Sequence, residues 1–375
     1  MFRKLPFIAL VLHVYVGWRL LADMPTGSFA FVAMAVWLLV SVIATPLWPV
    51  AWRIRRQPLK DRLTWASMLA MGAFSSLFVL TFIRDGGLLV SAVIGAVSVE
   101  AALRTHGAVA VPILAALATI VGFVNARGRA RIRRIDIPIA GLPAALNGFS
   151  IAQISDLHVG PTIKRDYLDR VVDAVNSLGA DMIAVTGDLV DGTVKELSRH
   201  TAPLSRLTSR HGAFFVTGNH EYYSGANAWV KEVRRLGVAV LLNEHVVLRH
   251  GGAVVVVAGV TDLYAGHFDP AHRSDPVAAM MGAPGDAGVR LLLAHQPGSA
   301  IAAASAGFDL QLSGHTHGGQ FFPWNFVVRL FHPLTAGLHR VGRLWIYISR
   351  GTGYWGPPQR LGAPSEITYL RLVPA

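Results

Sequence analysis

Five short motifs in the second half of the chain combine histidine with aspartate or asparagine. They are Asp156-Leu157-His158, Gly187-Asp188, Gly218-Asn219-His220-Glu221, a single His295, and Gly314-His315-Thr316-His317-Gly318-Gly319. Each motif follows a short apolar run that predicts a β-strand. Imidazole nitrogens mixed with carboxylate and amide oxygens suit Mn, Fe or Zn. The chain has no cysteine, which excludes thiolate ligands and disulfides.

The His315-Thr316-His317 motif decides how many ions the site would hold. Two histidines two positions apart point to opposite faces of a regular strand, so side by side they are a poor pair of ligands for one ion. The glycines Gly314, Gly318 and Gly319 permit a tight turn instead. In such a turn the two imidazoles can flank two neighbouring ions.

A two-ion centre of this composition is suited to phosphate chemistry. Two cations about 3.5–4 Å apart neutralise a phosphodiester or pyrophosphate and hold the attacking and leaving oxygens in line. A shared water between them loses a proton near neutral pH. A histidine outside the metal shell can titrate near neutral pH and act as a general acid.

Each motif taken alone has a simpler structural interpretation. Asp156 would serve as a turn residue, Asp188 as a helix cap and Asn219 as a left-handed turn residue. A single histidine such as His295 would more often be a strand-end residue whose ring nitrogens form hydrogen bonds within the protein. The ordered combination of all five motifs favours the metal centre.

The apolar runs from residue 149 onward alternate with amphipathic helical segments. Strands are predicted at 149–154, 182–186, 213–217, 246–249, 253–260, 289–293, 345–349 and 367–372, and helices at 164–178, 194–207 and 226–236. The early alternation predicts an α/β core in which helices cover a sheet, and the strand-rich second half predicts a second sheet packed on the first. Loops at the carboxyl ends of such strands are common places for functional sites.

Four apolar runs precede the motifs, at 5–21, 29–50, 63–83 and 108–124. A span needs about 20 apolar residues, with about 17 as the lower limit, so these runs predict about four transmembrane helices. The first run has no convincing cleavage site and is followed at once by the second, which favours an uncleaved anchor. Residues 86–103 have a short apolar core between charges. They predict an interfacial or re-entrant segment, or an extension of the third helix, in preference to a fifth span.

The basic residues are concentrated in the first third of the chain. Residues 1–134 hold 15 of the 34 Lys and Arg but only four acidic residues, a net charge of +11. With four spans and the N-terminus inside, the basic clusters near 3–4, 53–62 and 127–134 face the cytoplasm, as the positive-inside tendency requires. This predicts a cytoplasmic C-terminal domain. Nucleic-acid binding is disfavoured, because it would place the basic patch on the folded domain itself.

The ordered motifs between about residues 149 and 320 resemble the calcineurin-like metallophosphoesterases. The resemblance implies an α+β, four-layer αββα sandwich over 149–375, preceded by an all-α transmembrane region at 1–126 and by a basic linker with a first strand at 127–148. It also implies a metal-dependent hydrolase of phosphoric esters or anhydrides with two divalent ions (Mn, Fe or Zn, with Mn favoured).

The family pattern also implies a role for each motif residue. Asp156, His158 and His317 would bind the first ion, Asn219, His295 and His315 the second, and Asp188 would bridge them. His220 would be the catalytic residue that steadies the phosphate and protonates the leaving group. The residue after this histidine is usually aspartate in the family but is Glu221 here, which leaves the orientation of His220 in question.

A narrower resemblance is to membrane-associated bacterial phosphoesterases of the YkuE/YaeI type. It rests on 218–223, 314–320 and the Gly/Pro-rich segment 351–360. This branch includes pyrophosphatases that cleave UDP-2,3-diacylglucosamine to UMP and the lipid 1-phosphate in lipid A synthesis. The resemblance therefore implies an inner-membrane, multi-pass enzyme whose partners are membrane lipids and a phosphate-containing, lipid-linked nucleotide.

The apolar stretch Phe321–Phe331 directly follows the last motif and is unusually apolar for a loop beside a charged site. It either packs on the sheet or forms a lip that faces acyl chains or the bilayer, with Trp324 and Phe326 at the interface. Arg360 either binds a substrate phosphate in bidentate fashion or forms a surface ion pair. Two alternative functions stay open: a broad phosphodiesterase or phosphatase acting on soluble substrates, and a non-catalytic membrane scaffold or sensor.

Overall fold

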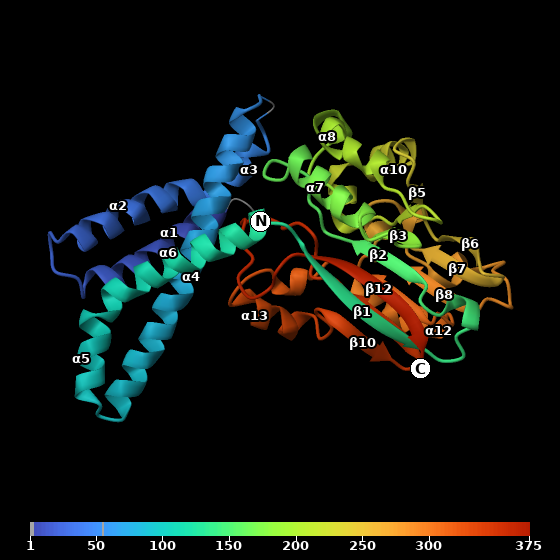
Figure 1. Ribbon diagram of the computed structural model, residues 1–375. Helices are drawn as coiled ribbons and strands as arrows, with labels where there is room; N and C mark the ends of the chain where they lie inside the picture. Colours follow the sequence, from blue (N-terminus) through green and yellow to red (C-terminus); the bar gives the residue numbers. More distant parts are fainter. Residues whose placement is uncertain (1–3, 55) are drawn as a thin grey trace. The chain divides into compact units, whose positions relative to one another are not determined.

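The computed structural model of the chain describes residues 4–54 and 56–375 (Figure 1). Two compact units are present. The helical unit comprises Met1–Arg127 and the short segment Gly356–Leu361, and the sheet unit comprises Gly128–Trp355 and Gly362–Ala375. Arg3 and Arg55, which belong to the basic clusters predicted to face the cytoplasm, lie outside the described residues.

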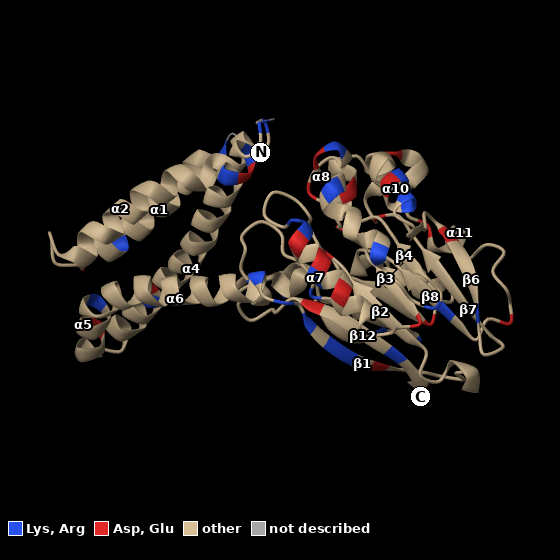
Figure 2. Cartoon of the chain, turned by 45° about the horizontal axis from the view of Figure 1, so that its top comes forward, with Lys and Arg blue, Asp and Glu red and all other residues tan. Residues whose placement is uncertain are grey.

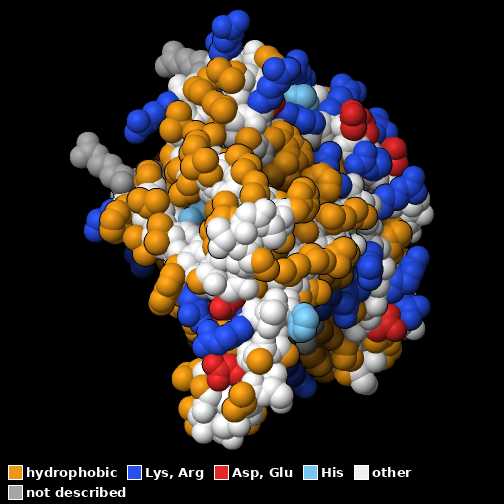
Figure 3. All heavy atoms as spheres, turned by 90° about the vertical axis from the view of Figure 1, so that its left-hand side faces the viewer, with side chains coloured by type: hydrophobic (Ala, Val, Ile, Leu, Met, Phe, Trp, Pro, Cys, Tyr) orange, Lys and Arg blue, Asp and Glu red, His pale blue; other side chains and the backbone are white. Residues whose placement is uncertain are grey.

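The helical unit consists mainly of apolar helices. Its helices in the described residues are α1 (Leu5–Leu21), α2 (Phe29–Ala44), α3 (Trp48–Ala51), α4 (Leu59–Val93), α5 (Val97–Thr105) and α6 (Gly107–Arg127). Large apolar side chains are exposed along them, as at Phe29 and Ile120, and Figure 3 shows such side chains gathered over this unit. Lys, Arg, Asp and Glu are sparse along α2, α4 and α6 (Figure 2). Such surfaces suit a lipid environment.

The number of spans differs from the prediction. Three helices are long and apolar enough to cross a membrane: Phe29–Ala51, Leu59–Val93 and Gly107–Arg127. The first predicted span, Leu5–Leu21, is an apolar helix of 17 residues, at the lower limit of a span. Length therefore separates one short apolar helix from three that are long enough to span a membrane, where the sequence predicted about four transmembrane helices.

Residues 86–93 extend the third predicted helix, which was one of the predicted alternatives for residues 86–103, and residues 97–105 form a separate short helix. Helix α4 runs without interruption for 35 residues, or about 52 Å, well beyond the predicted limit at residue 83. The chain turns after Val93 and returns as the short helix α5. At the beginning of this extension Arg84 is 3% exposed and pairs with Asp23.

The segment Gly356–Leu361 packs among the helices of the helical unit. A Cβ on Gly72 of α4 would approach Gln359 Nε2 to 2.7 Å, so this glycine lets the segment approach the helix closely. On α6, the carbonyl of Gly122 accepts a hydrogen bond from the Arg360 backbone N–H at 2.9 Å. Arg360 itself is fully buried.

The sheet unit contains two six-stranded mixed sheets. The first has the order β1-β12-β2-β3-β4-β5 and the second β10-β11-β9-β8-β7-β6. The strands are β1 (Arg131–Ile139), β2 (Ser150–Ile154), β3 (Met182–Val185), β4 (Ala213–Phe215), β5 (Ala239–Val240), β6 (Glu244–His250), β7 (Ala253–Gly259), β8 (Val289–Leu293), β9 (Leu310–Ser313), β10 (Gly337–Val341), β11 (Leu344–Ile348) and β12 (Glu366–Pro374). The runs β2-β3-β4-β5 and β11-β9-β8-β7 are parallel.

The main core lies between the two sheets. Alternate residues of β8 show why: Leu291 and Leu293 join the inter-sheet core, whereas Leu292 joins a second cluster that includes Ala300 and Ala303 of α12. A strand buried on both faces requires a covering layer on each side. The metallophosphoesterase-like sandwich predicted from the sequence is confirmed.

Helices form the outer layers of the sandwich. They are α7 (Arg165–Asn176), α8 (Val194–Thr201), α10 (Ala226–Arg235), α11 (Pro276–Met280) and α12 (Ala300–Ser305), with the short α9 (Asn219–Ser224) beginning inside the third motif. Helices α7, α8 and α10 lie on the side of the first sheet, and α12 covers the second (Figure 1). The stretch interpreted as an apolar loop instead forms a helix, α13 (Trp324–Phe331).

Candidate metal centre

The two sheets bring the five motifs to neighbouring strand ends. In the first sheet β2, β3 and β4 are parallel neighbours, and in the second β8 and β9 are. The residues that follow them are Asp156 and His158 after β2, Asp188 after β3, Asn219 and His220 after β4, His295 after β8, and His315 and His317 after β9. All of these residues lie where parallel strands end, which is where α/β sheets commonly place ligands.

The motif loops hold an unusual backbone conformation. Five of these residues have a φ between 50° and 72°, in the left-handed region: Asp156, His158, Asp188, His315 and His317. Non-glycine residues seldom adopt it, and it costs roughly 1–3 kcal/mol each, so it persists where surrounding structure enforces it. Such conformations cluster at functional sites. The predicted tight turn at His315 and His317 is therefore present, and the two histidines adopt the left-handed conformation together with Gly318 and Gly319.

Asp156, His158 and His317 form the first group of potential ligands. Nε2 of His317 lies 3.1 Å from Nε2 of His158 and 3.5 Å from Oδ1 of Asp156. All three residues are buried. Two imidazole nitrogens that converge with a carboxylate oxygen are a donor set that binds a divalent ion.

Asp188, His295 and His315 form the second group. Nε2 of His295 lies 3.2 Å from Oδ2 of Asp188 and 3.2 Å from Nδ1 of His315. Oδ1 of Asn219 is buried and accepts no hydrogen bond from the described residues. Since a buried amide oxygen is normally satisfied, this one requires a partner of another kind, and a cation is such a partner. Burial and the neighbouring His295 lower the pKa of His315 to about 3, so its imidazole is neutral.

The Asp188 carboxylate lies between the two groups. Its Oδ2 atom is 3.2 Å from Nε2 of His295 and 3.8 Å from Nε2 of His158. His315 and His317 accordingly belong to different groups. These residues fit two divalent ions, with Asp188 between them, and the assignment of each residue to an ion stays a prediction. Such ions would neutralise phosphate charge and acidify a bound water.

The sequence places Asp191 near the site as a loop acid or as a partner of a ligand residue, and in the structure it orients His220. Oδ1 of Asp191 lies 2.6 Å from Nδ1 of His220 and 3.2 Å from Nδ1 of His158. Burial raises the pKa of the Asp191 carboxyl, but the charges and hydrogen bonds of both histidines hold it well below its usual range. The carboxylate therefore fixes two rings with their Nε2 atoms directed toward the centre. In the sequence, this role of Asp191 was indicated by its position three residues after Asp188.

Glu221 does not contact the His220 ring as an orienting carboxylate and instead ties two motif loops together. Its carboxylate is fully buried and accepts hydrogen bonds from four backbone N–H groups. Three of these belong to Asp188, Leu189 and Val190, and the fourth to Gly218, at 2.7–3.3 Å. The substitution of the family's usual aspartate therefore leaves His220 oriented, through Asp191.

We expect Glu221→Ala to destabilise the sheet unit. The change leaves four buried donors unsatisfied at about 1–3 kcal/mol each before relaxation or water entry, so a loss of roughly 3–5 kcal/mol in unfolding free energy is expected. Denaturation of the full chain measures it. As a control, Glu244→Ala removes an exposed carboxylate and should change stability by less than about 1 kcal/mol. Equal stability of both variants would contradict the role of Glu221.

Aromatic rings border the centre at His220. The rings of Tyr223 and Trp355 lie edge-on to the His220 ring, with centroids 5.2 and 5.6 Å away. Gln320 holds Trp355 in place, because its side chain exchanges two 2.8 Å hydrogen bonds with the Trp355 backbone. Neither Tyr223 nor Trp355 was assigned a role in the site from the sequence.

The three predicted substrate residues have different surroundings. Trp324 and Phe326 lie on α13, which begins directly after the His317 loop, and are 42% and 58% exposed. Both residues therefore keep a large exposed face rather than being buried against the sheet. Arg360 is buried within the helical unit rather than grouped with the predicted ligands, and it lies on no exposed surface. Its role as a phosphate clamp stays a prediction that these contacts do not support.

Residues 149–319 match the calcineurin-like phosphoesterase family. A Danio rerio transmembrane protein with a metallophosphoesterase domain is 36% identical over 70% of this chain, and the chain spans only 62% of that relative's length. A Campylobacter jejuni metallophosphoesterase is 32% identical over 82% of each chain. The Bacillus subtilis metallophosphoesterase YkuE is 29% identical over 62% of this chain and 81% of its own. Taken with the motif geometry, this likeness shows that the chain belongs to the calcineurin-like metallophosphoesterases, a family of metal-dependent phosphoester hydrolases.

Proposed function

We propose that the chain is a membrane-anchored dimetal phosphoesterase that hydrolyses a phosphodiester or pyrophosphate bond in a lipid-linked substrate. The observation that carries this proposal is the pair of ligand groups that meet at the Asp188 carboxylate. With two divalent ions bound, neutral imidazoles and the Asn219 amide would leave the centre positive enough to attract phosphate. The ions would supply charge neutralisation and an acidified water.

His220 would donate the proton that the leaving group needs. Burial lowers the pKa of His220, but the charge of Asp188 and the hydrogen bond that the ring donates to Asp191 raise it to about 9. Nδ1 of His220 is held by Asp191, and Nε2 is directed toward the centre, 3.9 Å from Asp188 Oδ2. A positioned imidazolium is an effective general acid.

The membrane helices and α13 support a lipid substrate. Helix α13 has no buried residue and exposes Leu330 and Phe331 as well as Trp324 and Phe326. An exposed apolar helix of this kind is suited to the bilayer interface. It is joined to the ligand loop, because Gly319 packs directly against Asn325. Lipid drawn to α13 would therefore arrive next to His317.

UDP-2,3-diacylglucosamine is the specific substrate that we propose, with UMP and the lipid 1-phosphate as products and Mn²⁺ as the favoured metal. It combines a pyrophosphate with two acyl chains and so would use both the metal centre and the apolar helix. We also propose that the enzyme is a multi-pass protein of the inner membrane with its sheet unit in the cytoplasm, where the basic residues near the helix ends would lie.

The full chain, purified in detergent and loaded with Mn²⁺, tests the proposal in two stages. Hydrolysis of bis-p-nitrophenyl phosphate is expected first, and its absence from protein that retains two ions would favour a scaffold or sensor. Release of UMP from UDP-2,3-diacylglucosamine is expected next. Activity on UDP-N-acetylglucosamine alone would instead identify an enzyme for soluble substrates.

We expect Trp324→Ser combined with Phe326→Ser to impair hydrolysis of the lipid substrate selectively. A buried large apolar side chain contributes about 1.5–3 kcal/mol, so partial insertion of both side chains predicts a KM for the diacylated substrate at least about tenfold higher. The kcat/KM for bis-p-nitrophenyl phosphate should be unchanged, since neither side chain belongs to the ligand groups. Steady-state kinetics on both substrates measures the difference.

A matched control uses exposed apolar residues elsewhere on the sheet unit. Val277 on α11 and Ile301 on α12 are 62% and 75% exposed, and changing both to serine removes a similar apolar area. This control should leave both activities intact. Equal losses on the two substrates in the α13 variant would rule out a lipid-specific lip.

A further inference from the structure

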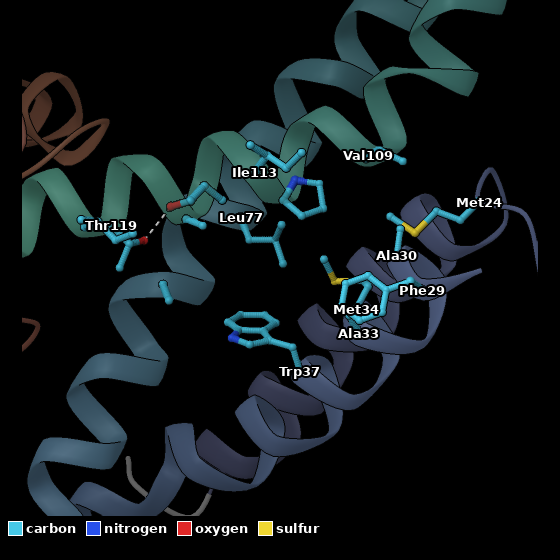
Figure 4. Close-up of a pocket in the computed structure, with 15 residues that line it drawn as sticks. Met24, Phe29, Ala30, Ala33, Met34, Trp37, Leu77, Val109, Ile113 and Thr119 are labelled. Atoms are coloured by element: carbon cyan, nitrogen blue, oxygen red, sulfur yellow. Dashed lines mark hydrogen bonds between the residues drawn. The ribbon is translucent and has the colours of Figure 1, made fainter. Parts of the chain in front are cut away.

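The helical unit contains an apolar groove that the hydrolase function does not use. It lies between α2, α4 and α6, next to the turn after α1, and has a volume of about 590 Å³ (Figure 4). Its walls include Trp37 on α2, Leu77 on α4 and Ile113 on α6. Figure 4 shows these side chains around the space between the helices.

Small side chains create the groove. Ala33 of α2, Ala73 of α4 and Ala116 of α6 line it, and they leave space that larger residues would fill. The polar group on the groove wall also does not need a hydrogen bond from an occupant. The hydroxyl of Thr119, which lies on the wall, already donates to the carbonyl of Ala115 at 2.7 Å. An aliphatic chain is therefore a suitable occupant.

One end of the groove lies beside a group of charged residues. Asp23 directly precedes Met24, which lines this end, and pairs with the buried Arg84. Arg104 lies 3.8 Å from Asp23, and its side chain is 51% exposed. An apolar groove with a charged end suits an amphiphile, because the apolar chain can lie in the groove and the polar headgroup can lie beside the charged residues.

The length of the groove favours an acyl chain over a membrane helix as its occupant. On α6 the lining extends from Val109 to Ile120, which corresponds to about 16 Å. This is about half of the roughly 30 Å hydrocarbon core, and so matches the depth of one leaflet. A membrane helix from a second copy of the chain would instead need contacts along the whole span.

We propose that the groove binds one acyl chain of a membrane lipid, with the lipid headgroup beside Asp23 and Arg104. The charged end lies at the beginning of α6, and Arg127, where the chain leaves the helical unit, lies at the other end. The bound lipid is therefore distinct from the proposed substrate. It fills the space between α2 and α6 and holds these helices in place.

Photocrosslinking of the full chain in nanodiscs tests this site. The probe is phosphatidylethanolamine with a diazirine in its acyl chain, and labelled peptides are mapped by mass spectrometry. We expect labelling to concentrate on the walls of the groove. Ala116→Trp fills the groove and should reduce this labelling about tenfold, because excluding two methylene groups removes about that much affinity. Ala33→Leu should act in the same direction.

Leu117→Trp is the matched control. Leu117 neighbours Ala116 on α6 and is 53% exposed, but it does not line the groove. This variant should keep the wild-type labelling, and all variants should keep their activity on bis-p-nitrophenyl phosphate, which reports intact folding. Even labelling of every exposed face of α6, or no loss in both groove variants, would overturn the proposal. Crosslinks between two chains through the groove, without lipid label, would identify a second copy as the occupant.

Discussion

We expect Asp188→Asn to abolish most of the phosphoesterase activity, with kcat/KM for bis-p-nitrophenyl phosphate reduced on the order of 10³-fold. The substitution preserves the size of the side chain but removes the negative charge next to His295 and His158. Two divalent ions close together repel each other, and the carboxylate between them offsets that repulsion. Losing this contribution of several kcal/mol corresponds to a factor of this size.

The metal content of the same variant separates this explanation from a loss of folding. Elemental analysis should find about two Mn²⁺ ions per wild-type chain and fewer than two in Asp188→Asn. Asp309→Asn is the control, because Asp309 is a partly buried aspartate just before β9, at the end of that strand away from the motifs. It should retain both ions and full activity. Two tightly held ions and nearly normal kinetics in Asp188→Asn would contradict the role of Asp188.

The strands and the ligand motifs were predictable because both depend on local patterns. The apolar runs that end at Ile154, Val185 and Leu293 have lengths typical of buried strands, and each is followed by a ligand-type residue. Parallel pairing then brings those ends together whatever the loops between them contain. The separation of His315 and His317 into two groups also followed from local geometry, because two residues at that spacing cannot face one point from a regular strand.

The contacts that complete the centre depend on the tertiary fold and were harder to predict from the sequence. Asp191 approaches His220 only because β3 and β4 are neighbours, and Glu221 reaches Leu189 for the same reason. A carboxylate in a loop has no local property that identifies its partner. The position of Trp355 depends in turn on Gln320, 35 residues away. These residues were visible in the sequence, but their partners were not.

For the helical segments, the sequence predicted the positions of the helices better than their ends. Apolar composition located the helices, but their ends depend on packing as well as on hydropathy. Helix α4 continues through Arg84 and Asp85 because buried and partly buried partners, including Asp23 and Arg19, neutralise these charges. Charged residues usually indicate the end of a span, so the sequence placed the end of this helix at residue 83 and offered its extension only as one alternative. Phe321–Phe331 was similarly interpreted as a loop, although α13 occupies most of it.

We expect His220→Ala to reduce kcat by about 10²–10⁴-fold while leaving both ions bound, because positioned general acids contribute a factor of this size. The His220 side chain belongs to neither of the two groups that meet at Asp188, although it also forms a third possible donor group with His158 and Asp191, and it lies 3.9 Å from Asp188 Oδ2. Asp191→Asn should reduce kcat less, by about tenfold to a hundredfold, since it disturbs the orientation and charge of the ring but leaves the ring present.

The double variant distinguishes an orienting role of Asp191 from an independent one. If Asp191 acts through His220, its substitution in the His220→Ala background should have almost no further effect on kcat, and the two losses should be strongly non-additive. Asp191 also contacts His158, so the metal content of each variant must be measured alongside the kinetics. A loss of Mn²⁺ in Asp191→Asn, with additive effects on kcat, would show that Asp191 acts through the first ligand group instead. Retained Mn²⁺ with non-additive losses is the expected result, because the Asp191–His220 contact of 2.6 Å is shorter than the Asp191–His158 contact of 3.2 Å.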